Sequence, residues 1–86
     1  MDAEQIRSRS EALVKQVYEA SQKGALPENF VLMGDDGILD SISILELVVA
    51  LEREFGIEVT GEDVRPENFQ DLPSLTVFIS HKISRP

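Results

Sequence analysis

The chain has 86 residues, with 8 Lys and Arg against 16 Asp and Glu, which gives a formal net charge of -8. This length allows one small domain with a thin core, and the negative charge disfavours binding to nucleic acid or to anionic membranes. The chain has no cysteine, which excludes disulfides, thiolate nucleophiles and cysteine-ligated metals. We therefore expect a single domain over residues 1–86 that binds or carries a group and is not an enzyme. A charge that serves only solubility is the alternative interpretation.

The N-terminal sequence and the apolar runs bear on where the protein acts. Residues 1–5 (MDAEQ) lack the basic and then apolar stretch of a secretory signal. No apolar run approaches the roughly 20 residues that a membrane span requires. We expect a cytoplasmic protein without membrane insertion.

The first predicted helix covers residues 3–22, and a long loop covers residues 23–40. Apolar residues recur at helical spacing in the first of these segments, and Gly24 and Pro27 prevent the helix from continuing. A loop as long as residues 23–40 is unusual in a compact domain. Because it also contains apolar side chains, we expect it to pack over the core. The apolar positions of the first helix are Ile6, Leu13, Val14 and Val17.

The clearest predicted helix covers residues 41–55 and ends at Gly56. Thr60 is expected to cap a short helix that Pro66 stops, and residues 68–69 are expected in a further turn. Asp71 can cap a last helix. The predicted fold is all-α, a small bundle of three main helices plus one short helix, with a long first loop. The inner stripe of the last helix is predicted to contain Leu72, Leu75, Phe78, Ile79 and Ile83, and Pro73 is tolerated in its first turn.

The helix over residues 41–55 has two apolar faces on a helical wheel drawn at about 100° per residue. One face is an ordinary core stripe, and the second, formed by Ile42, Leu45 and Val49, lies well over 90° from its centre. An apolar stripe with charges at its rim suits a docking surface, because apolar contacts supply affinity and charges supply steering. The alternatives are that the long loop covers this stripe or that the chain dimerises through it. Glu52 lies at one edge of the stripe, and Glu46 and Arg53 lie at the other.

Asp40 and Ser41 stand where the long loop meets this helix. One interpretation is an N-cap, in which the side chain of Ser or Asp accepts a hydrogen bond from an unpaired backbone N–H. The other is that Ser41 carries a phosphodiester, since helix N-termini favour anions. Asp40 would then help to hold the metal ion that a phosphoryl-transfer enzyme brings.

Residues 37–42 (GILDSI) and 46–57 (ELVVALEREFGI) together resemble the acyl carrier protein family. The resemblance runs from about Phe30 to Ile83 and so includes the last predicted helix. The first helix fits the family by position and length only. It implies that Ser41 accepts 4'-phosphopantetheine from coenzyme A through a separate holo-carrier synthase, a phosphopantetheinyl transferase. Ser43 is the competing serine, but it lacks a preceding Asp and lies one step inside the helix.

By this resemblance the chain holds an acyl or aminoacyl group as a thioester on the arm. It would act as a monomer and deliver the group to loading and transfer enzymes of fatty-acid, polyketide, lipid or non-ribosomal peptide type pathways. Ile42, Leu45, Glu46, Val49, Glu52 and Arg53 would face these partners. Ser43 and Arg53 stand where bacterial fatty-acid carriers commonly have acidic residues. These departures, and a loop similar to that of carriers serving adenylating enzymes, suggest a specialised carrier.

Two other features carry no chemistry of their own. Residues 35–37 (DDG) lack the glycine offset and the distal Glu of a calcium loop, so we expect no metal site. His81, the sole histidine, is expected at the surface and not as a catalytic base. The alternative to a carrier is a helical interaction domain without a prosthetic group.

Overall fold

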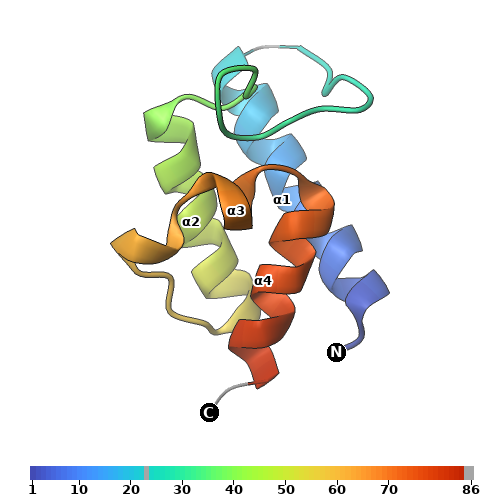
Figure 1. Cartoon of the computed structure of the whole chain (residues 1–86). Coiled ribbons are helices and arrows are strands. Elements are labelled where there is room, and N and C mark those ends of the chain that lie inside the picture. The colour runs from blue at the N-terminus through green and yellow to red at the C-terminus, as the bar shows by residue number, and fades with distance from the viewer. Residues whose placement is uncertain (23, 85–86) are drawn as a thin grey trace.

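The computed structural model describes residues 1–22 and 24–84 (Figure 1). Its described residues contain no β-strand, and α1 packs against both α2 and α4, while α3 packs against α4. The predicted all-α bundle is confirmed, with the loop between α1 and α2 at one end of the molecule. In the part of the chain that is described, no helix has the length and apolar character that crossing a membrane requires. The elements are α1 (Ala3–Gln22), α2 (Ser41–Phe55), the 3₁₀ helix η1 (Gly61–Asp63), α3 (Pro66–Phe69) and α4 (Leu72–Ser84).

The segment between α2 and α4 differs from the prediction. Thr60 caps η1, as expected, and forms a reciprocal capping box with Asp63. The helix ends at Asp63, and Pro66 then occupies the first turn of α3 instead of stopping a helix. Proline suits that position because it lacks the N–H that the first turn leaves unpaired and its φ is already helical. Residues 68–69 therefore lie in α3, not in a turn.

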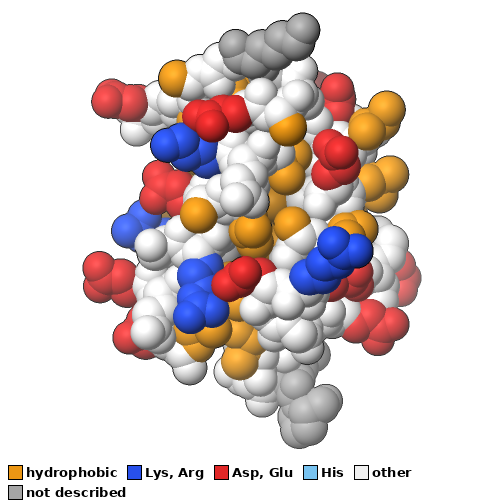
Figure 2. Space-filling model, turned by 180° about the vertical axis from the view of Figure 1, so that it is seen from behind, with side chains coloured by type: hydrophobic (Ala, Val, Ile, Leu, Met, Phe, Trp, Pro, Cys, Tyr) orange, Lys and Arg blue, Asp and Glu red, His pale blue; other side chains and the backbone are white. Residues whose placement is uncertain are grey.

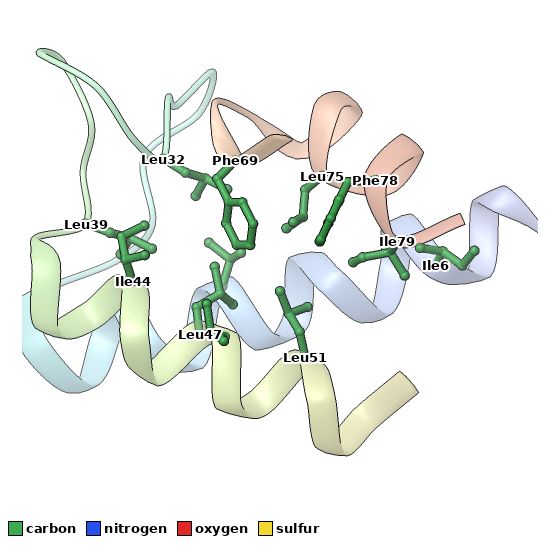
Figure 3. Packing of buried hydrophobic residues seen from close by; sticks show 12 residues of the cluster. Ile6, Leu32, Leu39, Ile44, Leu47, Leu51, Phe69, Leu75, Phe78 and Ile79 are labelled. Atoms are coloured by element: carbon green, nitrogen blue, oxygen red, sulfur yellow. The ribbon is translucent and has the colours of Figure 1, made fainter. Parts of the chain in front are cut away.

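The core lies between the three long helices and α3 (Figure 3). Each long helix contributes residues from one face, as an amphipathic helix requires, and Phe69 contributes from α3. The inner stripe of α4 is confirmed except at its end, because Ile83 is exposed. Leu13, Val17 and Leu72 are partly buried against the core. The buried apolar residues are Ile6, Val14, Leu32, Leu39, Ile44, Leu47, Val48, Leu51, Phe69, Leu75, Phe78 and Ile79.

The long loop packs over the core, as predicted, and backbone hydrogen bonds hold its second half. Ile38 N–H donates to the carbonyl of Val31 at 2.8 Å, and Leu39 N–H donates to that of Leu32 at 3.2 Å. A side chain at Gly37 would place its Cβ 2.7 Å from the Leu32 carbonyl oxygen, so glycine is required for this close approach. The buried side chains of Leu32 and Leu39 thus fix where α2 begins.

Candidate functional site

Asp40 is the N-cap of α2. Its backbone is extended, its Oδ1 accepts a hydrogen bond from Ser43 N–H at 2.8 Å, and its carbonyl accepts from Ile44 N–H at 2.9 Å. The hydrogen bonds from Ser43 lower the pKa of the Asp40 carboxyl, so this exposed group is ionised at neutral pH. The N-cap interpretation is therefore confirmed for Asp40 and not for Ser41, which is already the first residue of the helix.

Ser41 is exposed at the start of α2, beside an open cleft of about 510 Å³. One wall of this cleft comes from the loop, a second from α2, and a third from Val64 after η1. The first backbone N–H groups of a helix lack intrahelical acceptors, so they favour an anion bonded to Ser41. The cleft is lined by Met33, Gly34, Leu39, Asp40, Ser41, Ile44, Leu45 and Val64.

Ser43 occupies a different environment, although it lies only two residues further on. It is 1% exposed, and its Oγ donates a hydrogen bond to Ser21 Oγ at 3.2 Å. This contact joins the start of α2 to the end of α1. Ser43 is thus inaccessible to a transferase. Of the two positions at which fatty-acid carriers commonly have acidic residues, only Arg53 is exposed on α2.

The second apolar face of α2 is exposed. Ile42 is 71% exposed, Leu45 62% and Val49 46%, and we call these three residues the α2 stripe. Figure 2 shows hydrophobic side chains projecting at the edge of the molecule where the first half of α2 lies. The alternative in which the long loop covers this stripe is therefore wrong, whereas dimerisation through it remains untested.

The three charged residues at the rim of the α2 stripe are not equivalent. Glu46 and Arg53 are exposed. Glu52 is half-buried, and its carboxylate accepts a hydrogen bond from Val59 N–H at 2.9 Å, so it also anchors the segment after α2. Arg53 stands in the last turn of α2, where a cation interacts favourably with the helix dipole. The ion pairs found among the described residues are Arg7–Glu11, Arg9–Glu54 and Lys82–Asp63, and none involves Arg53.

The contact between Asp63 and Lys82 could not be found from the sequence. Lys82 Nζ lies 2.8 Å from Asp63 Oδ2 and 5.7 Å from the ring centroid of Phe78. The hydrogen bond from Lys82 lowers the pKa of the Asp63 carboxyl. This ion pair fastens η1 to α4, and the next residue, Val64, forms a wall of the cleft beside Ser41. His81 is exposed, as expected.

Comparison with known proteins identifies the class of protein that this fold and site define. Residues 12–80 match the family model described as a phosphopantetheine attachment site. The chain is also 27% identical over 84 residues to the acyl carrier protein of Thermosynechococcus vestitus, covering 98% of this chain and 99% of that protein. A comparison with solved structures found no significant match.

The chain therefore belongs to the acyl carrier protein family, whose members bear a covalent 4'-phosphopantetheine arm. The predicted family and cofactor are confirmed. Members of this family are carriers and not catalysts, which agrees with the expectation that the chain is not an enzyme. They interact with the synthases that load them and with acyl-handling enzymes. The alternative of an interaction domain without a prosthetic group is not supported.

The residues at the start of α2 fit such an arm. Ser41 offers an exposed hydroxyl for a phosphodiester, the helix N-terminus favours its negative charge, and the adjacent cleft has apolar walls. When bound, the arm supplies the thiol that this cysteine-free chain lacks.

Proposed function

We propose that Ser41 is the attachment residue, so that the protein carries acyl or aminoacyl thioesters on an arm at the start of α2. The observation that supports this most strongly is the contrast in exposure between the two serines of the motif. Ser41 is exposed beside the cleft, whereas Ser43 is 1% exposed and hydrogen-bonded to Ser21. A transferase must reach the hydroxyl that it modifies, and only the first of these two serines meets that condition.

In this proposal Ser41 Oγ attacks the phosphorus of coenzyme A that bears the pantetheine. The new O–P bond forms as the pyrophosphate bond breaks, adenosine 3',5'-bisphosphate leaves, and the hydroxyl proton passes to a base of the transferase. The ionised carboxylate of Asp40 is next to the reacting serine and can share the divalent cation that the transferase binds. Only one of its oxygens is engaged by the cap hydrogen bond that is described above.

The test is the intact mass of the protein after incubation with a phosphopantetheinyl transferase and coenzyme A. We expect the wild type and Ser43→Ala to gain one phosphopantetheine and Ser41→Ala to gain none. Because Asp40 is the cap, Ser41→Ala should keep the melting temperature of the unmodified wild type, which excludes unfolding as the cause. Loading of Ser41→Ala would overturn the assignment.

We further propose that the α2 stripe and its exposed rim charges, Glu46 and Arg53, dock the partner enzymes. Three exposed apolar residues that follow the attachment site on one helix face support this, since exposed apolar patches mark interaction sites. Glu52 would contribute less charge to docking because it bonds to Val59. The partners would be the holo-carrier synthase and acyl- or aminoacyl-transfer enzymes, and we expect the carrier to act as a monomer in the cytoplasm.

The positive charge of Arg53 favours the partner enzymes of a dedicated pathway over partner enzymes that dock through basic patches. Arg53 lies about 18 Å along the helix axis from Ser41, beside the α2 stripe, where a positive charge repels a basic partner. As the only carrier in a reconstituted fatty-acid synthase, the loaded protein should support elongation poorly, and Arg53→Glu should raise the rate. Arg7→Gln, a charge change on α1, is the control. Wild-type elongation equal to that of a fatty-acid carrier would contradict the specialisation.

A further inference from the structure

The cleft beside Ser41 ends at a closed wall. Leu39 and Ile44 line its inner side, and they are 7% and 5% exposed. These two side chains belong at the same time to the buried core. An apolar chain attached through Ser41 can therefore lie in the cleft, but it meets the packed interior directly behind these residues.

The space behind this wall is filled by Phe69 of α3. Its side chain is fully buried, and its ring centroid lies 5.5 Å from that of Phe78. In Figure 3 the Phe69 ring lies between Leu39 and Ile44 on one side and Leu75 and Phe78 on the other. Core side chains pack at the density of organic crystals, so a guest chain enters only by displacing one of them.

Hydrogen bonds on both sides of Phe69 restrain the segment that carries the ring. The side-chain amide of Asn68 donates to the carbonyl of Asp63 at 2.9 Å, and the carbonyl of Gln70 accepts from Leu32 N–H at 2.6 Å. Asp63 is in turn paired with Lys82 on α4. The segment that presents the ring is thus fastened to η1, to the loop and, through Asp63, to the last helix.

We propose that Phe69 closes the core to the cargo, so that this carrier handles short or polar acyl groups, such as acetyl-sized or aminoacyl groups, and does not shelter long apolar chains. The inference rests on the proposed attachment at Ser41. A long chain that lies in the open cleft keeps part of its apolar surface in water, and one that enters the core would have to displace a fully buried aromatic ring from its contact with Phe78. Both alternatives are unfavourable. A short or polar group has little apolar surface to bury and gains nothing from entering.

The test compares the acetyl and octanoyl forms of the protein, prepared with a broad-specificity phosphopantetheinyl transferase and acetyl- or octanoyl-coenzyme A. We expect the two melting temperatures to agree within about 2 °C and hydroxylamine to cleave both thioesters at the same rate. A buried octanoyl chain would raise the melting temperature by roughly 10 °C or more and slow the cleavage. That result would overturn the inference while leaving the proposed function intact. Failure of both coenzymes to load the protein would overturn the proposed function itself.

A variant of Phe69 tests whether this ring is what keeps the acyl chain out of the core. Phe69→Leu shortens the side chain behind the cleft, and its octanoyl form should melt higher than its acetyl form. Phe55→Leu is the control, because Phe55 lies at the far end of α2 and is only partly buried. Equal melting temperatures for the acetyl and octanoyl forms of Phe69→Leu would show that this ring does not exclude the chain. The same conclusion would follow if the octanoyl form of Phe55→Leu melted higher than its acetyl form by as much as in Phe69→Leu. If Phe69→Leu does not fold, the wild-type comparison still decides the inference.

Discussion

Two adjacent valines on α2 allow the docking surface to be separated from the core. Val49 is 46% exposed and belongs to the α2 stripe, whereas Val48 is 8% exposed and belongs to the core. In Val49→Glu the new carboxylate stays in water, one helical turn before Arg53, a spacing at which opposite charges stabilise a helix by a few tenths of a kcal/mol, roughly 0.2–0.5. We expect the free energy of unfolding to change by less than about 0.5 kcal/mol.

Val48→Glu should behave very differently, although the chemical change is the same. Its carboxylate would enter the core without a partner, at a cost of about 3–5 kcal/mol. That cost is a large part of the stability of a small domain, which is roughly 5–15 kcal/mol in total. Each kcal/mol shifts the melting temperature of a domain of this size by about 4–8 °C, so thermal unfolding followed by circular dichroism resolves the two variants easily.

The functional half of the prediction uses the rate at which the loaded carrier passes its group to a partner enzyme. Val49→Glu and the uncharged Val49→Gln should both raise the KM of that enzyme for the carrier, since each removes apolar contact. A melting temperature that falls as far in Val49→Glu as in Val48→Glu would place Val49 in the core. An unchanged KM in both Val49 variants would show that the α2 stripe does not dock this partner.

Three further perturbations test the local physics of the fold. Asp40→Asn keeps a good capping side chain but removes the charge, so it should melt like the wild type and accept phosphopantetheine more slowly. Asp40→Ala should lower both the melting temperature and the loading rate. Loading of Asp40→Asn at the wild-type rate would show that the charge is not used. Lys82→Met should lower the free energy of unfolding by about 1 kcal/mol near neutral pH. Because the folded-state pKa of Asp63 is lowered, the stability from this pair is present above the ordinary carboxyl pKa of about 4 and is lost as the pH falls through the folded value. A difference in stability between the wild type and Lys82→Met that stays unchanged at acid pH would contradict this. Ser10 Oγ is buried without a hydrogen-bond partner among the described residues, so Ser10→Ala should raise the free energy of unfolding by about 1 kcal/mol, and a lower melting temperature would contradict that.

The bounds of the long helices could be predicted because their end signals are local in sequence. Asp40 caps α2, Gly56 ends it with a left-handed backbone (φ 63°), and Asp71 accepts a hydrogen bond from Ser74 N–H. Helical periodicity likewise separated the α2 stripe from the core face, since both depend only on residue spacing.

The features that could not be predicted depend on packing between distant segments. Ser43 stands where fatty-acid carriers commonly have an acidic residue, but here α1 supplies Ser21 as its hydrogen-bond partner and the side chain is buried. Asp63 and Lys82 meet only because α4 returns past η1. Pro66 was expected to stop a helix, and the sequence alone does not distinguish that role from a place in the first turn of the next helix.

The most direct test of the account is the location of the arm within the loaded protein. Trypsin cleaves after Lys and Arg, so residues 24–53 form one peptide that contains both Ser41 and Ser43. Fragmentation of this peptide in a tandem mass spectrometer reports which serine carries the phosphopantetheine mass. The account predicts that every fragment retaining the mass includes Ser41 and that fragments beginning at Ile42 lack it. Phosphopantetheine on Ser43, or in any other peptide, would contradict the assignment of the arm to the start of α2.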